Sequence, residues 1–186
     1  MVMKTIMYIH GYGSTGNATK AIKLRDMFPD ARVVAPTFDY DRVPPYDIFR
    51  RLSDIVGSEQ PAFIVGSSTG GYYALCCTAF YRGPVWCVNP VRDIMATIRR
   101  SFSGRVVDEG RLAEYECFDR EVFRRLRPDD GQLRFALSTD DELLGDHRPL
   151  LELFPNHGQV IWMDHCGHRF FRFDELRESL AATLAG

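Results

Sequence analysis

Short, largely apolar segments alternate along this chain with longer segments of helical periodicity. A strand with one solvent-exposed face would alternate apolar and polar residues, whereas continuous apolar runs are typical of strands buried on both faces. The expected strands cover residues 5–9, 32–35, 62–65, 85–88, 133–137 and 160–163. Strands that alternate with helices form the βαβ units of a parallel sheet. The sequence therefore predicts an α/β fold with about six mainly parallel strands and helices on both faces.

Four helices are expected between and after these strands, over residues 18–28, 46–56, 70–80 and 174–184. Because crossovers between parallel strands are right-handed, the first and third strands should lie side by side, in the order 2-1-3-4-5-6. The chain has 186 residues, so we expect a single domain over residues 1–186. Residues 91–128 contain no expected strand and include a charged, helix-like stretch over residues 111–126. This segment is long enough for a small helical cap or insertion.

The composition excludes several classes of partner. A net charge of −2 argues against nucleic acid, because polyanion binding needs a basic excess. The cysteines, five in number and without a C-x-x-C pair, favour free thiols in a reducing cytoplasm. No apolar run approaches the roughly 18 residues that span a membrane. We therefore expect a cytoplasmic protein with a small-molecule partner and neither a nucleic-acid nor a membrane partner, while its oligomeric state is not indicated.

Residues 66–70, G-S-S-T-G, fit the pattern G-x-S-x-G between an expected strand and an expected helix. In this strand–turn–helix setting the central residue, Ser68, sits in a strained turn with its hydroxyl exposed at the carboxyl edge of the sheet. The residues two positions away must be small so that strand and helix can close together, and Gly66 and Gly70 meet that requirement. Ser67 competes as nucleophile but is not at the centre of the glycine spacing. The alternative is a glycine-rich turn that binds an anion or nothing.

A serine nucleophile needs a base, and in such folds the acid and base follow the serine on loops after later strands. Asp141, after the fifth expected strand, is the predicted acid, and the nearby acidic alternatives are Asp140, Glu142 and Asp146. His168, after the sixth expected strand, is the predicted base, with His165 as its alternative. The loop with both histidines has a second reading as a metal site, whose ligands would be Asp164, His165, Cys166 and His168. That reading leaves the serine motif unexplained, so we expect no metal.

The loop after the first expected strand supplies the other half of an oxyanion hole. It contains His10-Gly11-Tyr12-Gly13, whose glycines let the backbone approach a substrate closely. The backbone N–H groups of Tyr12 and Thr69 are the predicted oxyanion donors. His10 is expected to brace this loop with hydrogen bonds. His147 and His157 are expected to be structural or surface histidines.

Several stretches together resemble the YqiA-like esterase family, a group of small bacterial α/β-hydrolases. They are M-Y-I-H-G-Y-G-S-T, I-V-G-S-S-T-G-G-Y-Y-A-L, V-N-P, T-D-D-E-L-L and C-G-H-R-F, which in this order span nearly the whole chain. The resemblance implies a minimal α/β-hydrolase fold, with Ser68 as nucleophile, His168 as base and Asp141 as acid. It also implies activity on short acyl esters and places Asn89-Pro90 near the pocket. Two features depart from the family: Asp140 stands where a glycine is usual, and residues 91–128 match poorly.

These observations predict a serine hydrolase that cleaves short-chain acyl esters through an acyl-enzyme and needs no cofactor. A thioesterase or small amidase would use the same Ser-His-Asp triad, and a non-catalytic binding protein on a hydrolase scaffold is an alternative from another class. Residues 91–128 are rich in arginine and poor in long apolar runs, so they cannot form the apolar wall of a tunnel for a long acyl chain. We expect acetyl to butyryl esters, or a small anionic acyl group if an arginine of this segment reaches the pocket; its arginines include Arg92, Arg99, Arg100, Arg105 and Arg111.

Overall fold

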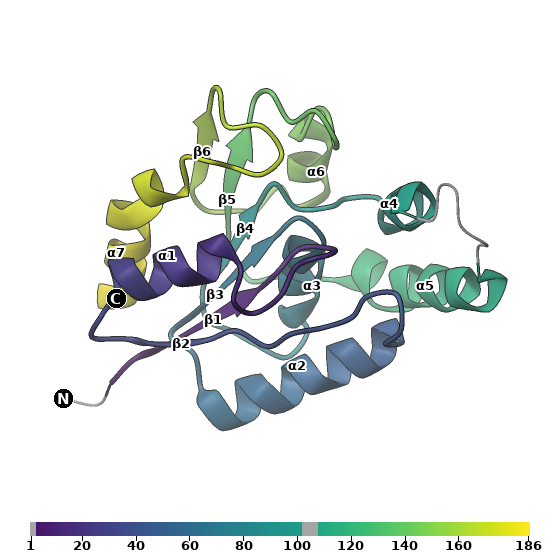
Figure 1. Cartoon of the computed structure of the whole chain (residues 1–186), viewed down its shortest axis with the longest axis horizontal. Helices are drawn as coiled ribbons and strands as arrows, with labels where there is room; N and C mark the ends of the chain where they lie inside the picture. The colour runs from purple at the N-terminus through teal and green to yellow at the C-terminus, as the bar shows by residue number, and fades with distance from the viewer. Residues whose placement is uncertain (1–2, 102–107) are drawn as a thin grey trace.

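The computed structural model of the chain describes residues 3–101 and 108–186. A six-stranded sheet runs through its centre in the order β2-β1-β3-β4-β5-β6, and every neighbouring pair is parallel (Figure 1). The strands are β1 (Thr5–Ile9), β2 (Arg32–Val34), β3 (Phe63–Ser67), β4 (Val85–Val88), β5 (Leu133–Ser138) and β6 (Val160–Met163). The predicted fold class and strand order are therefore confirmed.

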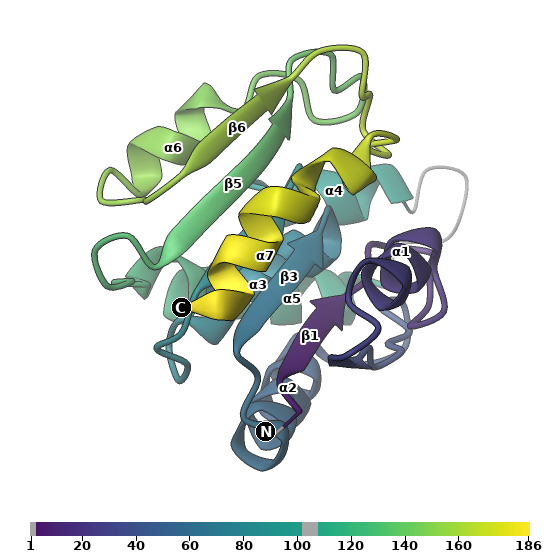
Figure 2. The ribbon, with the colours of Figure 1, turned by 90° about the vertical axis from the view of Figure 1, so that its left-hand side faces the viewer.

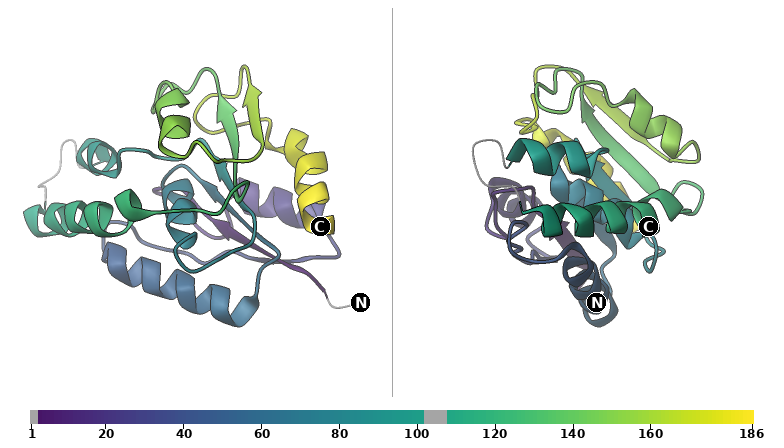
Figure 3. Two further views of the ribbon diagram at one scale, coloured as in Figure 1. Left: turned by 180° about the vertical axis from the view of Figure 1, so that it is seen from behind. Right: turned by 90° about the vertical axis from the view of Figure 1, so that its right-hand side faces the viewer.

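Helices cover both faces of the sheet. On one face lie α1 (Thr19–Met27) and α7 (Arg177–Ala185), the latter preceded by the 3₁₀ turn η2 (Phe173–Leu176). In Figure 2, α7 stands in front of the strands and α1 lies at the right, beside the end of β1. The other face, seen from two sides in Figure 3, packs against α2 (Pro45–Glu59), α3 (Thr69–Cys77), α4 (Ile94–Ser101), α5 (Glu109–Glu121), the 3₁₀ turn η1 (Phe123–Arg125) and α6 (Arg148–Leu153). This is the two-faced covering that the apolar strands require.

The expected helices are all present, but α4 and α6 are two that the sequence did not predict. The stretch expected as one helix over residues 111–126 is divided into α5 and η1. Helices α4 and α5 pack against each other at the right of Figure 1. The cap expected over residues 91–128 lies partly outside the described residues, because residues 102–107 are not among them. Among the helices that the structure describes, none combines the length and apolar character needed to cross a membrane.

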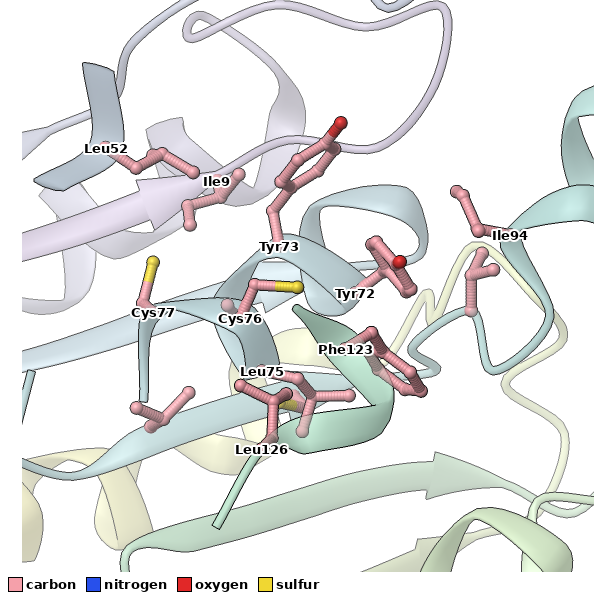
Figure 4. Packing of buried hydrophobic residues seen from close by; sticks show 14 of the residues in the cluster. Ile9, Leu52, Tyr72, Tyr73, Leu75, Cys76, Cys77, Ile94, Phe123 and Leu126 are labelled. Atoms are coloured by element: carbon pink, nitrogen blue, oxygen red, sulfur yellow. The ribbon is translucent and has the colours of Figure 1, made fainter. Parts of the chain in front are cut away.

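Helix α3 is the central piece of the larger apolar core. All nine of its residues are buried, so its position is fixed by contacts on every side. The ring of Tyr72 stacks on the ring of Phe123 with centroids 4.6 Å apart, and the ring of Tyr73 stacks on that of Tyr40 at 5.6 Å. Figure 4 labels Tyr72, Tyr73 and Phe123 among the buried residues around α3. These two tyrosines belong to the core rather than to a pocket. Close packing of this kind holds the first turn of α3, where the serine motif ends, in one place.

Candidate active site

Ser68 occupies the sharp turn between β3 and α3. Its backbone has φ +57° and ψ −122°, a strained conformation for a residue with a side chain. A Cβ atom at Gly66 would lie 2.2 Å from the carbonyl oxygen of Gly70, and one at Gly70 would lie 2.1 Å from the carbonyl oxygen of Ile9. Both positions therefore exclude any larger residue. The two glycines allow β1, β3 and α3 to approach closely enough to hold Ser68 in the strained turn.

The hydroxyl of Ser68 meets the imidazole of His168, which lies on the loop between β6 and η2. Ser68 Oγ is 2.8 Å from His168 Nε2, and His168 Nδ1 lies 3.0 and 3.1 Å from the two carboxylate oxygens of Asp141. An ionised carboxylate only accepts hydrogen bonds, so Nδ1 carries the ring proton and Nε2 is free to accept from the serine. The structure thus brings together the three residues that the sequence singled out as nucleophile, base and acid.

Asp141 follows β5, and its side chain is fully buried. Its Oδ1 accepts hydrogen bonds from the backbone N–H groups of Leu143 and Leu144, at 3.0 and 2.8 Å. Burial opposes ionisation of this carboxyl, but hydrogen bonds from His147, His168 and the Leu144 amide outweigh burial and hold its pKa well below the usual range. Asp141 is therefore an anion at neutral pH, as an acid that orients an imidazole must be.

A second histidine contacts the same carboxylate, which sequence reasoning did not foresee. His147 Nε2 lies 3.0 Å from Asp141 Oδ2, and the His147 side chain is buried. Since the carboxylate is the acceptor, Nε2 of His147 carries a proton and donates it. The sequence offered no periodic signal for this contact, because it depends on how the loop between β5 and α6 folds back on itself.

The acidic neighbours of Asp141 hold the loops in place. Asp140 Oδ1 accepts from the Ser138 hydroxyl at 2.5 Å and from the amides of Cys166 and Gly167 at 3.1 Å each. This carboxylate thereby joins the loop after β5 to the loop after β6. Glu142 Oε2 accepts from the backbone N–H of His168 at 2.8 Å. Neither carboxylate is bonded to an imidazole nitrogen among the described residues, unlike Asp141.

Asn89, at the end of β4, ties the same loops to the centre of the sheet. The side chain is fully buried. Its Nδ2 donates to the carbonyl oxygens of Gly167 and His168 at 3.0 and 3.2 Å, and its Oδ1 accepts from the Ser138 N–H at 2.7 Å. The resemblance placed this residue near the pocket, but its bracing contacts were not predicted. One amide therefore links the ends of β4 and β5 to the loop that carries His168.

The loop after β1 lies directly against the candidate nucleophile. A Cβ atom at Gly11 would lie 3.2 Å from Ser68 Cβ, which puts the chain from Gly11 to Tyr12 beside the serine. His10 braces this loop: its Nε2 accepts from the Phe38 N–H at 2.9 Å, so its Nδ1 carries the proton that is donated to the Gly11 carbonyl oxygen at 2.7 Å. Burial lowers the pKa of His10, which keeps this neutral tautomer.

Thr69 begins α3, so its backbone N–H is one of the amides at that helix end that have no acceptor within the helix. Both Thr69 and Tyr12 line the cavity in front of Ser68. The hydroxyl of Tyr12 donates to Asp41 Oδ1 at 2.5 Å, so its side chain is anchored. The hydroxyl oxygen of Thr69 is buried and has no hydrogen-bond partner in the part of the chain that the structure describes.

Ser68 and His168 line a cavity of about 750 Å³. Its apolar walls include Leu143, Leu144 and Phe170, and its charged lining residues are Lys20, Lys23, Arg100, Glu142 and Arg169. Arg92 lines a separate cavity of about 470 Å³. Of the arginines considered for an anionic acyl group, Arg100 on α4 lines the Ser68 cavity, whereas Arg92, Arg99 and Arg111 do not, and Arg105 lies outside the described residues.

The four residues considered as metal ligands do not converge on one point. The carboxylate of Asp164 accepts from the Thr139 hydroxyl at 2.6 Å, while His168 is engaged with Ser68 and Asp141. Nowhere in residues 3–101 and 108–186 do three His, Cys, Asp or Glu side chains gather as they would around a metal ion. All five cysteines are free thiols.

Comparison with known proteins agrees with the fold. The profile of the uncharacterised protein family UPF0227 matches residues 5–184. Mouse alpha/beta hydrolase domain-containing protein 10 is similar with a TM-score of 0.74 at 14% identity, over 97% of this chain and 89% of that chain. Est1E from Butyrivibrio proteoclasticus gives 0.73 at 10% identity, over 99% and 89%. The esterase domain of a Rhodothermus marinus protein gives 0.68 at 17% identity, over 97% and 87%.

At these low identities the solved structures establish a common fold and nothing finer. The match to the family profile is of another kind, because it extends over almost the whole chain. The motifs at Ser68, Asp141 and His168 all fall within it. This chain is therefore a member of the family UPF0227, the YqiA family, and has the α/β-hydrolase fold.

Proposed function

We propose that this protein is a serine hydrolase that cleaves short-chain acyl esters through an acyl-enzyme. The observation that carries the proposal is the hydrogen-bonded line from Ser68 Oγ through the His168 imidazole to the Asp141 carboxylate, with distances of 2.8 and 3.0 Å. A protein that only binds ligands has no need of a strained serine aligned with an oriented imidazole. The fold that the chain shares with esterase structures supports the same reaction class.

In the acylation step Ser68 Oγ attacks the ester carbonyl carbon while His168 Nε2 takes the hydroxyl proton. Asp141 stabilises the resulting imidazolium and keeps the Nδ1 proton directed toward itself. The former carbonyl oxygen, now negative, accepts hydrogen bonds from the backbone N–H groups of Tyr12 and Thr69. When the tetrahedral intermediate collapses, the bond to the leaving oxygen breaks. His168 returns its proton to that oxygen, and the alcohol departs.

Deacylation repeats the sequence with water as the nucleophile. His168 Nε2 takes a proton from the water as its oxygen attacks the acyl carbon on Ser68. The same two amides bind the oxyanion again, and the proton then returns to Ser68 Oγ as the carboxylic acid leaves. The cycle closes with the free hydroxyl and needs no group beyond the side chains and amides named here.

The short acyl chain in this proposal follows from the lining of the cavity. Burial of each CH₂ group against an apolar wall contributes about 0.8 kcal/mol. The cavity offers leucine and phenylalanine side chains beside Ser68, but Lys20, Arg100, Glu142 and Arg169 interrupt its walls. An acyl chain of eight or more carbons would pass these charged groups and gain little from them. Acetyl to butyryl groups fit within the apolar part.

The nucleophile is tested by labelling with a fluorophosphonate, which reacts with an activated serine. Ser68→Ala should abolish labelling and reduce hydrolysis of p-nitrophenyl butyrate by roughly 10⁶-fold, because attack through the acyl-enzyme is lost. Ser67→Ala is the matched control and should keep both, since its hydroxyl lies one residue off the strained turn. Unchanged turnover in Ser68→Ala, with a circular dichroism spectrum like that of the wild type, would contradict the assignment.

The acyl preference is measured with the same protein as kcat/KM for p-nitrophenyl esters from C2 to C12. We expect kcat/KM to be highest between C2 and C4 and to decline for longer acyl chains, because longer chains would pass the charged side chains that line the cavity. A maximum at C8 or longer would show that the small acyl site is wrong, while leaving the triad chemistry intact.

A further inference from the structure

Positive charge without a counter-charge lines the cavity next to the candidate base. Lys20 lies in the first turn of α1, and Arg169 directly follows His168. The two residues meet because α1 packs beside the segment that contains η2 (Figures 1 and 2), and Lys20 Nζ donates to the Arg169 carbonyl oxygen at 2.6 Å. Both residues line the cavity that contains Ser68. Within the described ranges, neither has a carboxylate at ion-pair distance, whereas Lys23 is paired with Asp174 at 2.5 Å.

The ammonium group of Lys20 has no carboxylate to compensate its charge in the part of the chain that the structure describes. Lys20 is half-buried, and its ammonium group donates to a neutral carbonyl rather than to a carboxylate. Burial, together with the nearby charges of Lys23 and Arg169, lowers the pKa of Lys20 to about 8. Glu142 is the acidic side chain that lines the same cavity, but its carboxylate is engaged with the His168 amide. Clustered like charges in a cleft are typical of a binding site for the opposite charge.

We propose that Lys20 and Arg169 form a subsite for an anionic group, a carboxylate or a phosphate, carried by the leaving group of the substrate. The subsite rests on the proposed hydrolase function, because the position of the leaving group is fixed by the chemistry. His168 Nε2 must protonate the departing oxygen, so that oxygen lies against His168. Arg169 is the next residue along the chain, and Lys20 is bonded to its carbonyl. The group attached to the departing oxygen therefore extends toward these two cations, and the substrate is an ester of an anionic alcohol.

The test compares matched esters that differ in one charge. The first pair is 4-carboxyphenyl butyrate and its uncharged methyl ester, with 4-(phosphonomethyl)phenyl butyrate as the phosphate-like arm. The second pair is p-nitrophenyl hydrogen succinate and p-nitrophenyl butyrate, in which the charge lies on the acyl side. For the wild type we expect kcat/KM to be about tenfold or more higher for the anionic leaving group than for its neutral partner, as for a hydrogen bond to a charged group. The carboxylate and phosphonate arms distinguish the two sources of the anion.

Variants locate the subsite. Lys20→Met and Arg169→Gln should each reduce the anionic preference toward unity and leave kcat/KM for the neutral ester near its wild-type value. Lys4→Met removes the same charge outside the cavity and should change neither quantity. Arg100→Gln removes a cation from another wall, where its guanidinium donates to the Leu143 carbonyl oxygen, and should leave the preference in place.

The subsite is wrong if the wild type does not distinguish the first pair, if both variants keep its preference, or if the charge matters only on the acyl side. Loss of the preference in Arg100→Gln alone would also overturn it. Activity on the neutral esters and fluorophosphonate labelling report on the hydrolase separately, so failure of the subsite is distinguishable from failure of the proposed function.

Discussion

The carboxylate of Asp141 accepts hydrogen bonds from two histidines at once. His168 approaches it from the side of Ser68, and His147 contacts Oδ2 from within the protein. Each donor draws electron density from the carboxylate, so the bond from His147 limits how strongly Asp141 stabilises a positive charge on His168. In the proposed mechanism, His147 is therefore a positioning residue that acts on His168 through the Asp141 carboxylate.

Replacement of His147 should change the pH profile as well as the stability. His147→Phe removes the donor, and we expect the free energy of unfolding to fall by about 2 kcal/mol, as for a lost hydrogen bond to a charged group. The acid limb of the kcat/KM profile should move to higher pH, because the less solvated carboxylate stabilises the imidazolium of His168 more strongly. His147→Gln can place an N–H near the position of Nε2 and should restore both properties. If the acid limb of the kcat/KM profile does not move in His147→Phe, the role of His147 is purely structural.

Residue-scale reasoning from the sequence reached Ser68, Asp141 and His168, because each follows an expected strand at a position that the chemistry requires. It did not reach His147, since a loop residue with no periodic neighbours carries no signal of where it will point. It also left Asp140 open as the acid. Only the folded loop distinguishes a carboxylate that faces an imidazole from one that accepts two backbone amides.

At the scale of elements, three strand ends depend on one side chain. Asn89 joins β4 to β5 through the Ser138 amide and to the loop after β6 through two carbonyl groups. Its backbone has φ +40°, a region that asparagine tolerates better than most residues. The position therefore requires both an amide and a permissive backbone. Among the strands that the structure describes, β6 lies at the edge of the sheet and pairs with β5 alone, so the Asn89 side chain adds to the contacts that hold the loop with His168 in place.

Two variants separate these requirements. Asn89→Gly tolerates the positive φ but loses the hydrogen bonds, and we expect the free energy of unfolding to fall by about 2–3 kcal/mol, together with kcat, because His168 is less firmly positioned. Asn89→Ala loses the same bonds and adds backbone strain, so it should cost about 1 kcal/mol more. Urea denaturation and turnover of p-nitrophenyl butyrate measure the two effects. Wild-type kcat in both variants would mean that the His168 loop does not need the bridge.

The elements differed in how well the sequence predicted them. Strands β1, β4 and β6 begin and end where expected, because their apolar runs are bounded by turn residues. Helix α6 was missed because six residues are too few to display a period. Helix α4 was missed because its buried residues, Ile94 and Ile98, form a single narrow stripe within a charged segment. Short helices of this kind are stabilised by packing on the apolar surface of the sheet. The local sequence pattern does not show that such a surface will lie against them.

At the scale of the whole molecule, the cavity is assembled from both ends of the sequence. Lys20 belongs to the first helix, and Arg169 to the loop after the last strand, yet the two are hydrogen-bonded. The cations expected near an anionic group were arginines of residues 91–128, and Lys20 was not among them. The proximity of these two cations arises from the tertiary fold, and the local sequence around either residue does not predict it.

The preference for an anionic leaving group should therefore depend on pH. Because burial and the charges of Lys23 and Arg169 lower the pKa of Lys20 to about 8, its ammonium group is present below that pH and is lost above it. The ratio of kcat/KM for 4-carboxyphenyl butyrate to that for its methyl ester should be constant near pH 7 and fall between about pH 7.5 and 9. Changes that affect both esters cancel in the ratio. Lys20→Met should give a low ratio with no such fall, and a wild-type ratio that is constant to pH 9.5 would contradict the lowered pKa.

The position of His168 on the loop after the edge strand β6 also has a consequence for biosynthesis. A ribosome makes the Ser68 turn first, the Asp141 loop after it and the His168 loop last of the three. In a nascent chain that has completed β3 and α3, the hydroxyl of Ser68 is no more reactive than that of any other alcohol, because the imidazole of His168 is not yet present to take its proton. In the proposed mechanism, hydrolysis therefore requires β6 and the loop that follows it. Chains that terminate before residue 168 should accordingly be inactive toward esters.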